Sequence, residues 1–212
     1  KAFLVRWYDE LAWAGIYDQT ADPARHRLQG AIDDPTRSEL REMAETPLLL
    51  TIMARVNYKK GLPDSRAMLY EDYVEQLLWE WERKRQDDPG QPTVLESLLK
   101  QAGVNRVSLE RALNELAYKV HGQQGSRDTV DIPRWQMRET IEAIHPDRQK
   151  GADWALQVLD LIDYRSGLIR SLKKGEIYQF THRTFQEYLA ARWMAGHGYR
   201  TKFDERIDDD NW

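Results

Sequence analysis

The chain has 212 residues, 41% hydrophobic and 31% charged, which is typical of a globular protein of one or two domains. Its net charge of −4 excludes a general bias toward nucleic acid or anionic membranes, and the absence of cysteine excludes disulfides and thiolate chemistry. No apolar run approaches the ~20 residues of a membrane span. We therefore expect no membrane segment, no secretory signal and a cytoplasmic location.

The first part of the chain is predicted to be a bundle of helices. Proline after a capping residue marks helix starts, and acidic-proline or glycine-proline clusters mark the breaks between them. Because the chain begins at Lys1 without methionine, we expect it to be part of a larger protein. The predicted helices cover residues 3–14, Asp22-Pro23 to Asp33, Leu40 to Met43, Thr46-Pro47 to Ala54, and Leu69 to Trp81 with Arg83-Lys84-Arg85 at its end.

A stretch rich in proline, glycine and aspartate at residues 86–92 predicts a linker, after which the hydrophobic pattern changes. Three helices are predicted beyond it. Ser108 is expected to cap the first, which ends near Gly122; Pro133 opens the second; and the third contains Trp154 and Ile162.

A β-hairpin is predicted after these helices. Gly167 ends the third helix, and residues 168–172 and 176–180 have strand character on either side of a turn at Lys173-Lys174-Gly175. Three helices followed by a hairpin are the element order of a winged helix. We therefore predict a mainly α fold, a helical bundle domain followed by a winged-helix domain with a small hairpin.

The hairpin passes directly into a last predicted helix with a histidine at the join. Tyr178 and Phe180 alternate with polar neighbours as in a half-buried strand, and Thr184 with Glu187 matches a capping box that starts a helix at Thr184. His182 would then lie just outside a helix N-terminus, where free N–H groups and the helix dipole favour an anion such as phosphate. A histidine that only satisfies local backbone groups is the alternative.

The sequence contains no recognisable catalytic or metal-binding motif. There is no G-x-x-x-x-G-K-[ST] or G-x-G-x-x-G loop, no H-E-x-x-H, and no metal-ligand spacing among the five histidines. We predict no catalytic residue, no bound metal and no enzyme activity for this part of the protein.

A winged helix also raises the alternative of nucleic-acid binding. The helix before the hairpin would read DNA, yet it carries Asp153, Asp160 and Asp163 against Arg165. Acidic side chains repel phosphates, so binding to nucleic acid is not expected. A helical adaptor that binds a partner protein is the remaining alternative.

Three segments resemble the NACHT-type signalling NTPases, a family of STAND ATPases that includes the NOD-like receptors. Residues 40–51 are similar to its L-x-x-L-A-x-N-P-L-L-L-T stretch, and residues 69–78 to the L-Y-E segment that follows. Residues 180–191 resemble its F-x-H-x-[ST]-F-Q-E-[YF]-x-A-A signature. One departure is Thr46, where the family has asparagine; threonine is also a good N-cap.

The resemblance implies a regulatory fragment that follows the nucleotide-binding core of such an ATPase. The core, with its Walker motifs and magnesium, would precede Lys1 and would be this fragment's partner in the same chain. Pro47 matches the proline that packs on adenine, and His182 matches the histidine that contacts the β-phosphate of ADP. ADP and ATP are thus the implied cofactors of the parent protein, which is expected to change conformation on nucleotide exchange, with a homo-oligomer possible on activation.

The predicted domain organisation follows from these elements. A helical domain covers residues 1–86, a linker 87–94, and the winged-helix domain 95–198. Residues 199–212 form a tail or the start of a further domain.

Overall fold

The computed structural model describes residues 2–13, 21–63, 65–80, 91–122, 130–165 and 167–197. It contains two compact units, residues 1–74 and 75–212, each described here by itself. The predicted boundaries at 86 and 95 stay a prediction, and the basic helix end at residues 83–85 and the tail from 199 lie outside the described residues.

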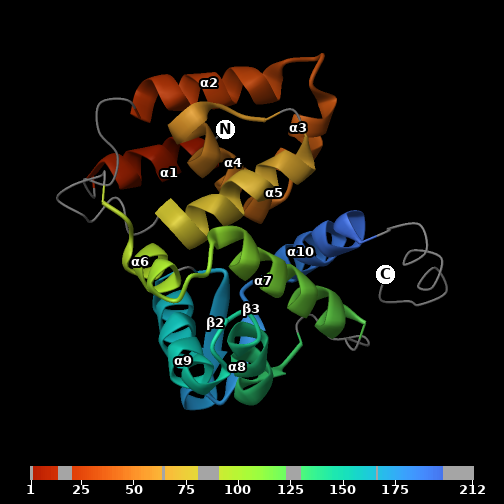
Figure 1. The fold of residues 1–212 in the computed structure, drawn as a ribbon. Helices are drawn as coiled ribbons and strands as arrows, with labels where there is room; N and C mark the ends of the chain where they lie inside the picture. The colour runs from red at the N-terminus through yellow and green to blue at the C-terminus, as the bar shows by residue number, and fades with distance from the viewer. Residues whose placement is uncertain are drawn as a thin grey trace. The chain divides into compact units, whose positions relative to one another are not determined.

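The first unit is a helical bundle in which α2 packs against α1, α3 and α4 (Figure 1). Its buried side chains come from every helix, as the apolar stripes predicted; they include Leu4, Leu28, Leu40, Ile52, Met53 and Leu69. The helices are α1 (Ala2–Trp13), α2 (Ala21–Asp33), α3 (Ser38–Ala44), α4 (Pro47–Lys60) and α5 (Arg66–Glu75), whose last residue belongs to the second unit.

A buried polar cluster joins three helices of this unit. The amide of Asn57 on α4 donates to the carbonyl of Ala24 on α2 at 2.6 Å and lies 3.4 Å from the hydroxyl of Tyr8 on α1. Tyr8 donates to the carbonyl of Ala54 at 2.9 Å, so the buried hydroxyl and amide both have partners. The same burial raises the pKa of Tyr8.

The second unit contains the predicted helices and hairpin, so the fold class predicted from the sequence is confirmed. In Figure 1, α10 lies beside α7; β2 packs against α9, and β3 packs against α8. Its elements are η1 (Gln76–Glu80), α6 (Val94–Gln101), α7 (Arg106–His121), β1 (Ile132–Pro133), α8 (Arg134–Glu142), α9 (Arg148–Arg165), β2 (Ile169–Leu172), η3 (Lys173–Gly175), β3 (Ile177–Phe180) and α10 (Arg183–Gly196).

The three strands form an antiparallel sheet in the order β1-β3-β2. In the hairpin Leu172 pairs with Ile177 and Ile169 with Phe180, so Glu176 belongs to the turn and not to the strand predicted for residues 176–180. The turn itself uses positive φ at Lys173 and Lys174 as well as at Gly175. The sequence did not predict β1, because a strand of two residues, one of them a proline, carries no periodic signal.

Several helix starts differ from the prediction. Helix α2 begins at Ala21, so Asp22 lies inside the helix instead of capping it. The N-cap of α7 is Asn105, whose side chain accepts from the N–H of Ser108 at 2.9 Å; Ser108 is therefore the capped residue. The predicted long helix from Leu69 changes from α to π hydrogen bonding at Gln76.

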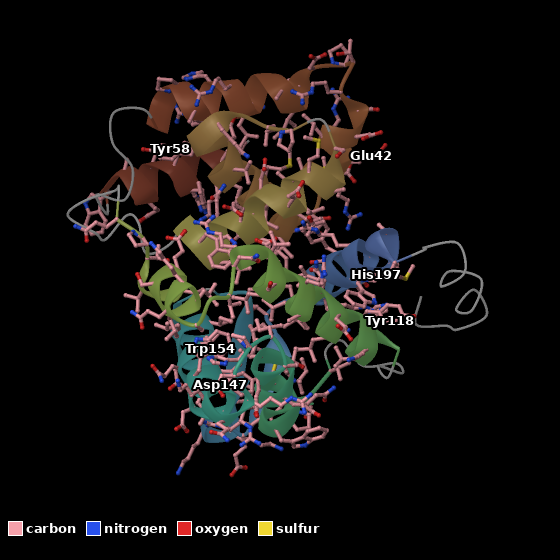
Figure 2. The ribbon with its side chains drawn as sticks, in the orientation of Figure 1. Glu42, Tyr58, Tyr118, Asp147, Trp154 and His197 are labelled. Atoms are coloured by element: carbon pink, nitrogen blue, oxygen red, sulfur yellow. The ribbon has the colours of Figure 1, made fainter. Side chains whose placement is uncertain are left out.

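Helix α6 was not predicted, although its sequence carries a complete capping box. Thr93 accepts from the N–H of Glu96 at 3.2 Å, and the carboxylate of Glu96 accepts from the N–H of Thr93 at 2.7 Å. The indole of Trp154 on α9 donates to the carbonyl of Leu98, which attaches α6 to the helix before the hairpin (Figure 2).

Candidate functional site

The join between β3 and α10 is anchored to the join between α9 and β2. Thr181 donates from its N–H to the carbonyl of Leu168 at 2.9 Å and from its hydroxyl to the carbonyl of Gly167 at 2.7 Å. The backbone of Gly167 has a φ of 64°, which glycine adopts readily, and in this conformation its carbonyl accepts from the hydroxyl of Thr181. The residue after Thr181 is therefore held at a fixed place in the winged helix.

That residue is His182, which is the N-cap of α10, so its predicted place just outside a helix N-terminus is confirmed. Its backbone is extended, and its side chain makes no capping hydrogen bond. Its carbonyl accepts from the N–H of Phe185 at 3.1 Å, which begins the helix. The imidazole is therefore not used to cap its own helix.

The imidazole of His182 is exposed, and one edge lies against a buried ring. The centroid of Phe185 is 5.7 Å away in an edge-to-face arrangement. Desolvation by this packing, and then the guanidinium of Arg170, hold the pKa of His182 below its ordinary 6.5. The ring is therefore mainly neutral at neutral pH and offers one N–H donor.

Arg170 was not predicted as a site residue. It lies on β2 opposite Gln179, three residues before His182, because of the hairpin register. Its guanidinium is exposed and lies 3.5 Å from the side-chain oxygen of Gln179. The predicted turn of residues 173–175 would place Arg170 opposite Tyr178, so the sequence alone did not locate this second cation near His182.

Most other residues of the segment 180–191 support the fold. Phe180, Phe185, Leu189 and Ala190 are buried. Gln186 is also buried, and its amide lies 3.2 Å from Nδ1 of a buried histidine on α7. Packing and hydrogen bonding thus account for these side chains, whereas the imidazole of His182 is exposed apart from its edge contact with Phe185.

The predicted capping box at Thr184 is wrong. The helix begins at Arg183, and the buried hydroxyl of Thr184 has no hydrogen-bond partner. Glu187 instead pairs with Arg183, with 2.8 Å between the two side chains. The cap position lies two residues before Thr184 because Thr181 is tied to the α9–β2 join.

Pro47 lies at the N-terminus of α4, and the prediction that Thr46-Pro47 starts this helix is confirmed. Thr46 is the N-cap, with its carbonyl accepting from the N–H of Leu50 at 2.9 Å, but its side chain makes no capping bond. The proline ring is exposed, whereas Leu49, two positions further along, is buried. An exposed, rigid apolar ring therefore stands at the start of a buried helix.

Pro47 belongs to the first unit and His182 to the second. Each position is thus defined within its own unit, and a joint contact of the two with one nucleotide stays a prediction. Among the described residues, no group of three His, Asp or Glu side chains could hold a metal ion. No helix of the described ranges is long and apolar enough to cross a bilayer.

The helix that would read DNA in a winged helix is α9. Asp153 and Asp160 are exposed on it, and Asp163 accepts from the N–H of Ser171 at 2.6 Å. Among the side chains described on this helix, the exposed basic residues are Arg148 and Lys150, and both lie in its first turn. This distribution of charge disfavours phosphate contacts along the helix.

Comparison with known proteins found one family. The sequence model described as winged helix-turn-helix domain C-terminal to NACHT matches residues 66–194. No curated protein and no solved structure gave a significant match. The matched range begins with α5 and ends within α10, so it covers the described elements of the second unit except the last two residues of α10.

Proposed function

Because the chain belongs to the family of winged helix-turn-helix domains C-terminal to NACHT, we propose that it is the regulatory part of a NACHT-type signalling ATPase. In this proposal His182 contacts the β-phosphate of bound ADP, and Pro47 packs on the adenine ring. The observation that carries the proposal is that the imidazole of His182 is exposed at the start of α10 and free of any capping role.

The chemistry around His182 fits a phosphate. The neutral imidazole offers an N–H donor, the first N–H groups of α10 point toward the same end of the helix, and Arg170 adds a positive charge nearby. A phosphate next to the ring would favour the imidazolium and strengthen the hydrogen bond. We therefore expect nucleotide retention by the parent protein to increase as the pH falls toward the pKa of His182.

The chemistry around Pro47 fits a purine base. Its pyrrolidine ring is apolar, exposed and rigid, and the proline conformation suits the first helical position, so contact with a flat base costs little ordering entropy. Thr51 donates to the carbonyl of Pro47 at 2.9 Å, which fixes the first turn beneath the ring. Thr46 is the N-cap of α4, at the position of the asparagine in the resembled motif.

The upstream nucleotide-binding core is the proposed partner of both units. That core would supply the phosphate loop, the magnesium ion and the hydrolytic residues, while this fragment holds the nucleotide from the opposite side. When ADP is bound, His182 would stabilise the closed arrangement, and exchange for ATP would release it.

The size of the effect is set by one hydrogen bond. A hydrogen bond to a charged group contributes roughly 1.5–3 kcal/mol. A nucleotide shifts the equilibrium only by its difference in affinity for the closed and open states. Loss of this bond would change the closed-to-open ratio by about ten-fold or more.

The test uses His182→Ala in the full-length parent. We expect faster ADP release and higher basal signalling output, with His182→Gln giving a smaller effect because its amide still donates. The matched control is His197→Ala at the other end of α10, where the ring stacks on Trp193 at 3.6 Å. Wild-type ADP release and output in His182→Ala would show that His182 is structural.

A further inference from the structure

The turn of the hairpin holds two lysines in a backbone conformation that suits glycine and asparagine. Lys173 has a φ of 48° and Lys174 a φ of 58°, and Gly175 follows with a φ of 84°. A left-handed backbone is unfavourable for lysine, and asparagine and glycine usually occupy such positions in short hairpin turns. Both lysines are exposed, and neither has an ion-pair partner among the described residues. The turn therefore carries backbone strain at two positions whose charges stabilise no ion pair, and strain of this kind clusters at functional sites.

Arg134, the first residue of α8, adds a third cation at this turn. Its guanidinium donates to the carbonyl of Gly175 at 3.4 Å, and its backbone N–H donates to the carbonyl of Glu176 at 2.9 Å. A Cβ on Gly175 would lie 3.2 Å from Nη1 of Arg134, so the glycine also leaves room for this approach. Arg134 is exposed and has no ion-pair partner within the described ranges. We call the surface of Lys173, Lys174 and Arg134 the wing tip.

An exposed indole stands next to the wing tip in the sequence. Trp135 follows Arg134 on α8 and is 62% exposed. It lines a groove of about 780 Å³ between α7 and α8, and the buried side chains of Ala112 and Leu116 line the same groove. Tryptophan and arginine are the residues that most often dominate the binding energy of protein–protein interfaces. The wing tip is thus joined to an apolar anchoring point.

The charges around the wing tip determine which kind of anion fits it. Asp153 and Asp160 are exposed on α9, which packs against β2, and Glu139 is exposed one helical turn beyond Trp135 on α8. A nucleic acid carries phosphates at regular intervals, so it would have to pass these carboxylates on a chain whose net charge is −4. A protein segment can instead concentrate its carboxylates at the cations and place apolar side chains elsewhere. Charge complementarity therefore favours an acidic, partly apolar protein segment.

We propose that the wing tip and Trp135 form a docking surface for an acidic segment of a partner protein. Carboxylates of the segment pair with Lys173, Lys174 and Arg134, and an apolar side chain of the segment packs on Trp135 in the groove between α7 and α8. The wing tip lies at the turn of the hairpin, whereas His182 follows the opposite end of β3. The docking surface is therefore separate from the proposed nucleotide contact and does not depend on it.

The test is fluorescence anisotropy of the complete chain with a short labelled peptide of glutamates around a central tryptophan-leucine pair. We expect binding that weakens as the salt concentration rises, and binding about ten-fold weaker or less when glutamine replaces the glutamates. A single-stranded oligonucleotide and vesicles that contain phosphatidylserine should bind more weakly than the acidic peptide at the same ionic strength. Tighter binding of either would assign the wing tip to a nucleic acid or a membrane and overturn the proposal. Absence of peptide binding at low salt would also overturn it.

A double substitution in the turn separates binding from folding. Lys173→Asn combined with Lys174→Gly removes both charges and introduces residues that suit a left-handed backbone. It should raise Tm by about 2–4 °C and weaken peptide binding by about ten-fold or more. Arg134→Gln and Trp135→Ser should each weaken binding, whereas Lys100→Gln, which removes an exposed cation of α6, should not. Unchanged affinity in the double variant, or an equal loss in Lys100→Gln, would contradict the proposed docking surface.

Discussion

Two threonines of the second unit are expected to respond in opposite ways to the same substitution. Thr93 is 1% exposed and caps α6 in a reciprocal pair of hydrogen bonds with Glu96. Thr184 matches the same sequence pattern, but its buried hydroxyl has no partner. Replacement of each by valine keeps a β-branched side chain of similar shape and removes only the hydroxyl.

The expected magnitudes follow from these contacts. Thr93→Val loses the N-cap and leaves the N–H of Glu96 without its acceptor, which costs about 1–2 kcal/mol of unfolding free energy. Thr184→Val removes a hydroxyl that is buried without a hydrogen bond. Because such a group carries a desolvation cost of about 1–3 kcal/mol, we expect unchanged or increased stability.

The assay is thermal and denaturant unfolding of the chain, followed through the transition of the second unit, to which both residues belong. For a protein of this size 1 kcal/mol corresponds to about 2–4 °C in Tm. Thr93→Val should lower Tm, Thr184→Val should not, and Thr93→Ser should retain most of the cap. A loss of stability in Thr184→Val as large as that in Thr93→Val would refute the reasoning.

Further predictions concern three polar contacts of the second unit. Gln186→Leu should lower the unfolding free energy by about 1–3 kcal/mol in denaturant unfolding, because it removes the amide that lies next to His121. Replacing both Gln186 and His121 by leucine should recover part of this lost stability. Packing and Arg170 hold the pKa of His182 below 6.5, so this residue's contribution to stability should fall as the pH drops from above 6.5 through the folded pKa. Comparison of wild type with His182→Gln between about pH 7.5 and 5.5 measures that dependence, and identical pH profiles would contradict it. Arg106 lies 4.7 Å over an indole and pairs with two glutamates. Arg106→Ala should therefore lower the unfolding free energy by about 1–2 kcal/mol, measured in thermal melts. Arg106→Lys should recover only the charge and not the planar stacking, and full recovery would argue against the stacking.

The sequence determined those parts of the fold whose signals are local. Proline fixes its own φ and suits the first helical position, so Thr46-Pro47 located the start of α4. Glycine tolerates positive φ, so Gly167 and the turn at Gly175 located the hairpin. The place of His182 at a strand-to-helix join was predicted from the strand pattern of Tyr178 and Phe180 and from a capping box at Thr184; the place is confirmed, although that capping box does not form.

Only the tertiary structure decided how the polar groups at these positions are used. Thr93 and Thr184 carry the same local pattern, but Thr93 is the N-cap of its helix, whereas α10 has its N-cap at His182 and the hydroxyl of Thr184 is buried without a partner among the described residues. Burial of Gln186 against α7, exposure of the imidazole of His182, and the approach of Arg170 likewise depend on elements far apart in the sequence. A short motif specifies which hydrogen bonds are available, but packing between distant elements selects which of them are made.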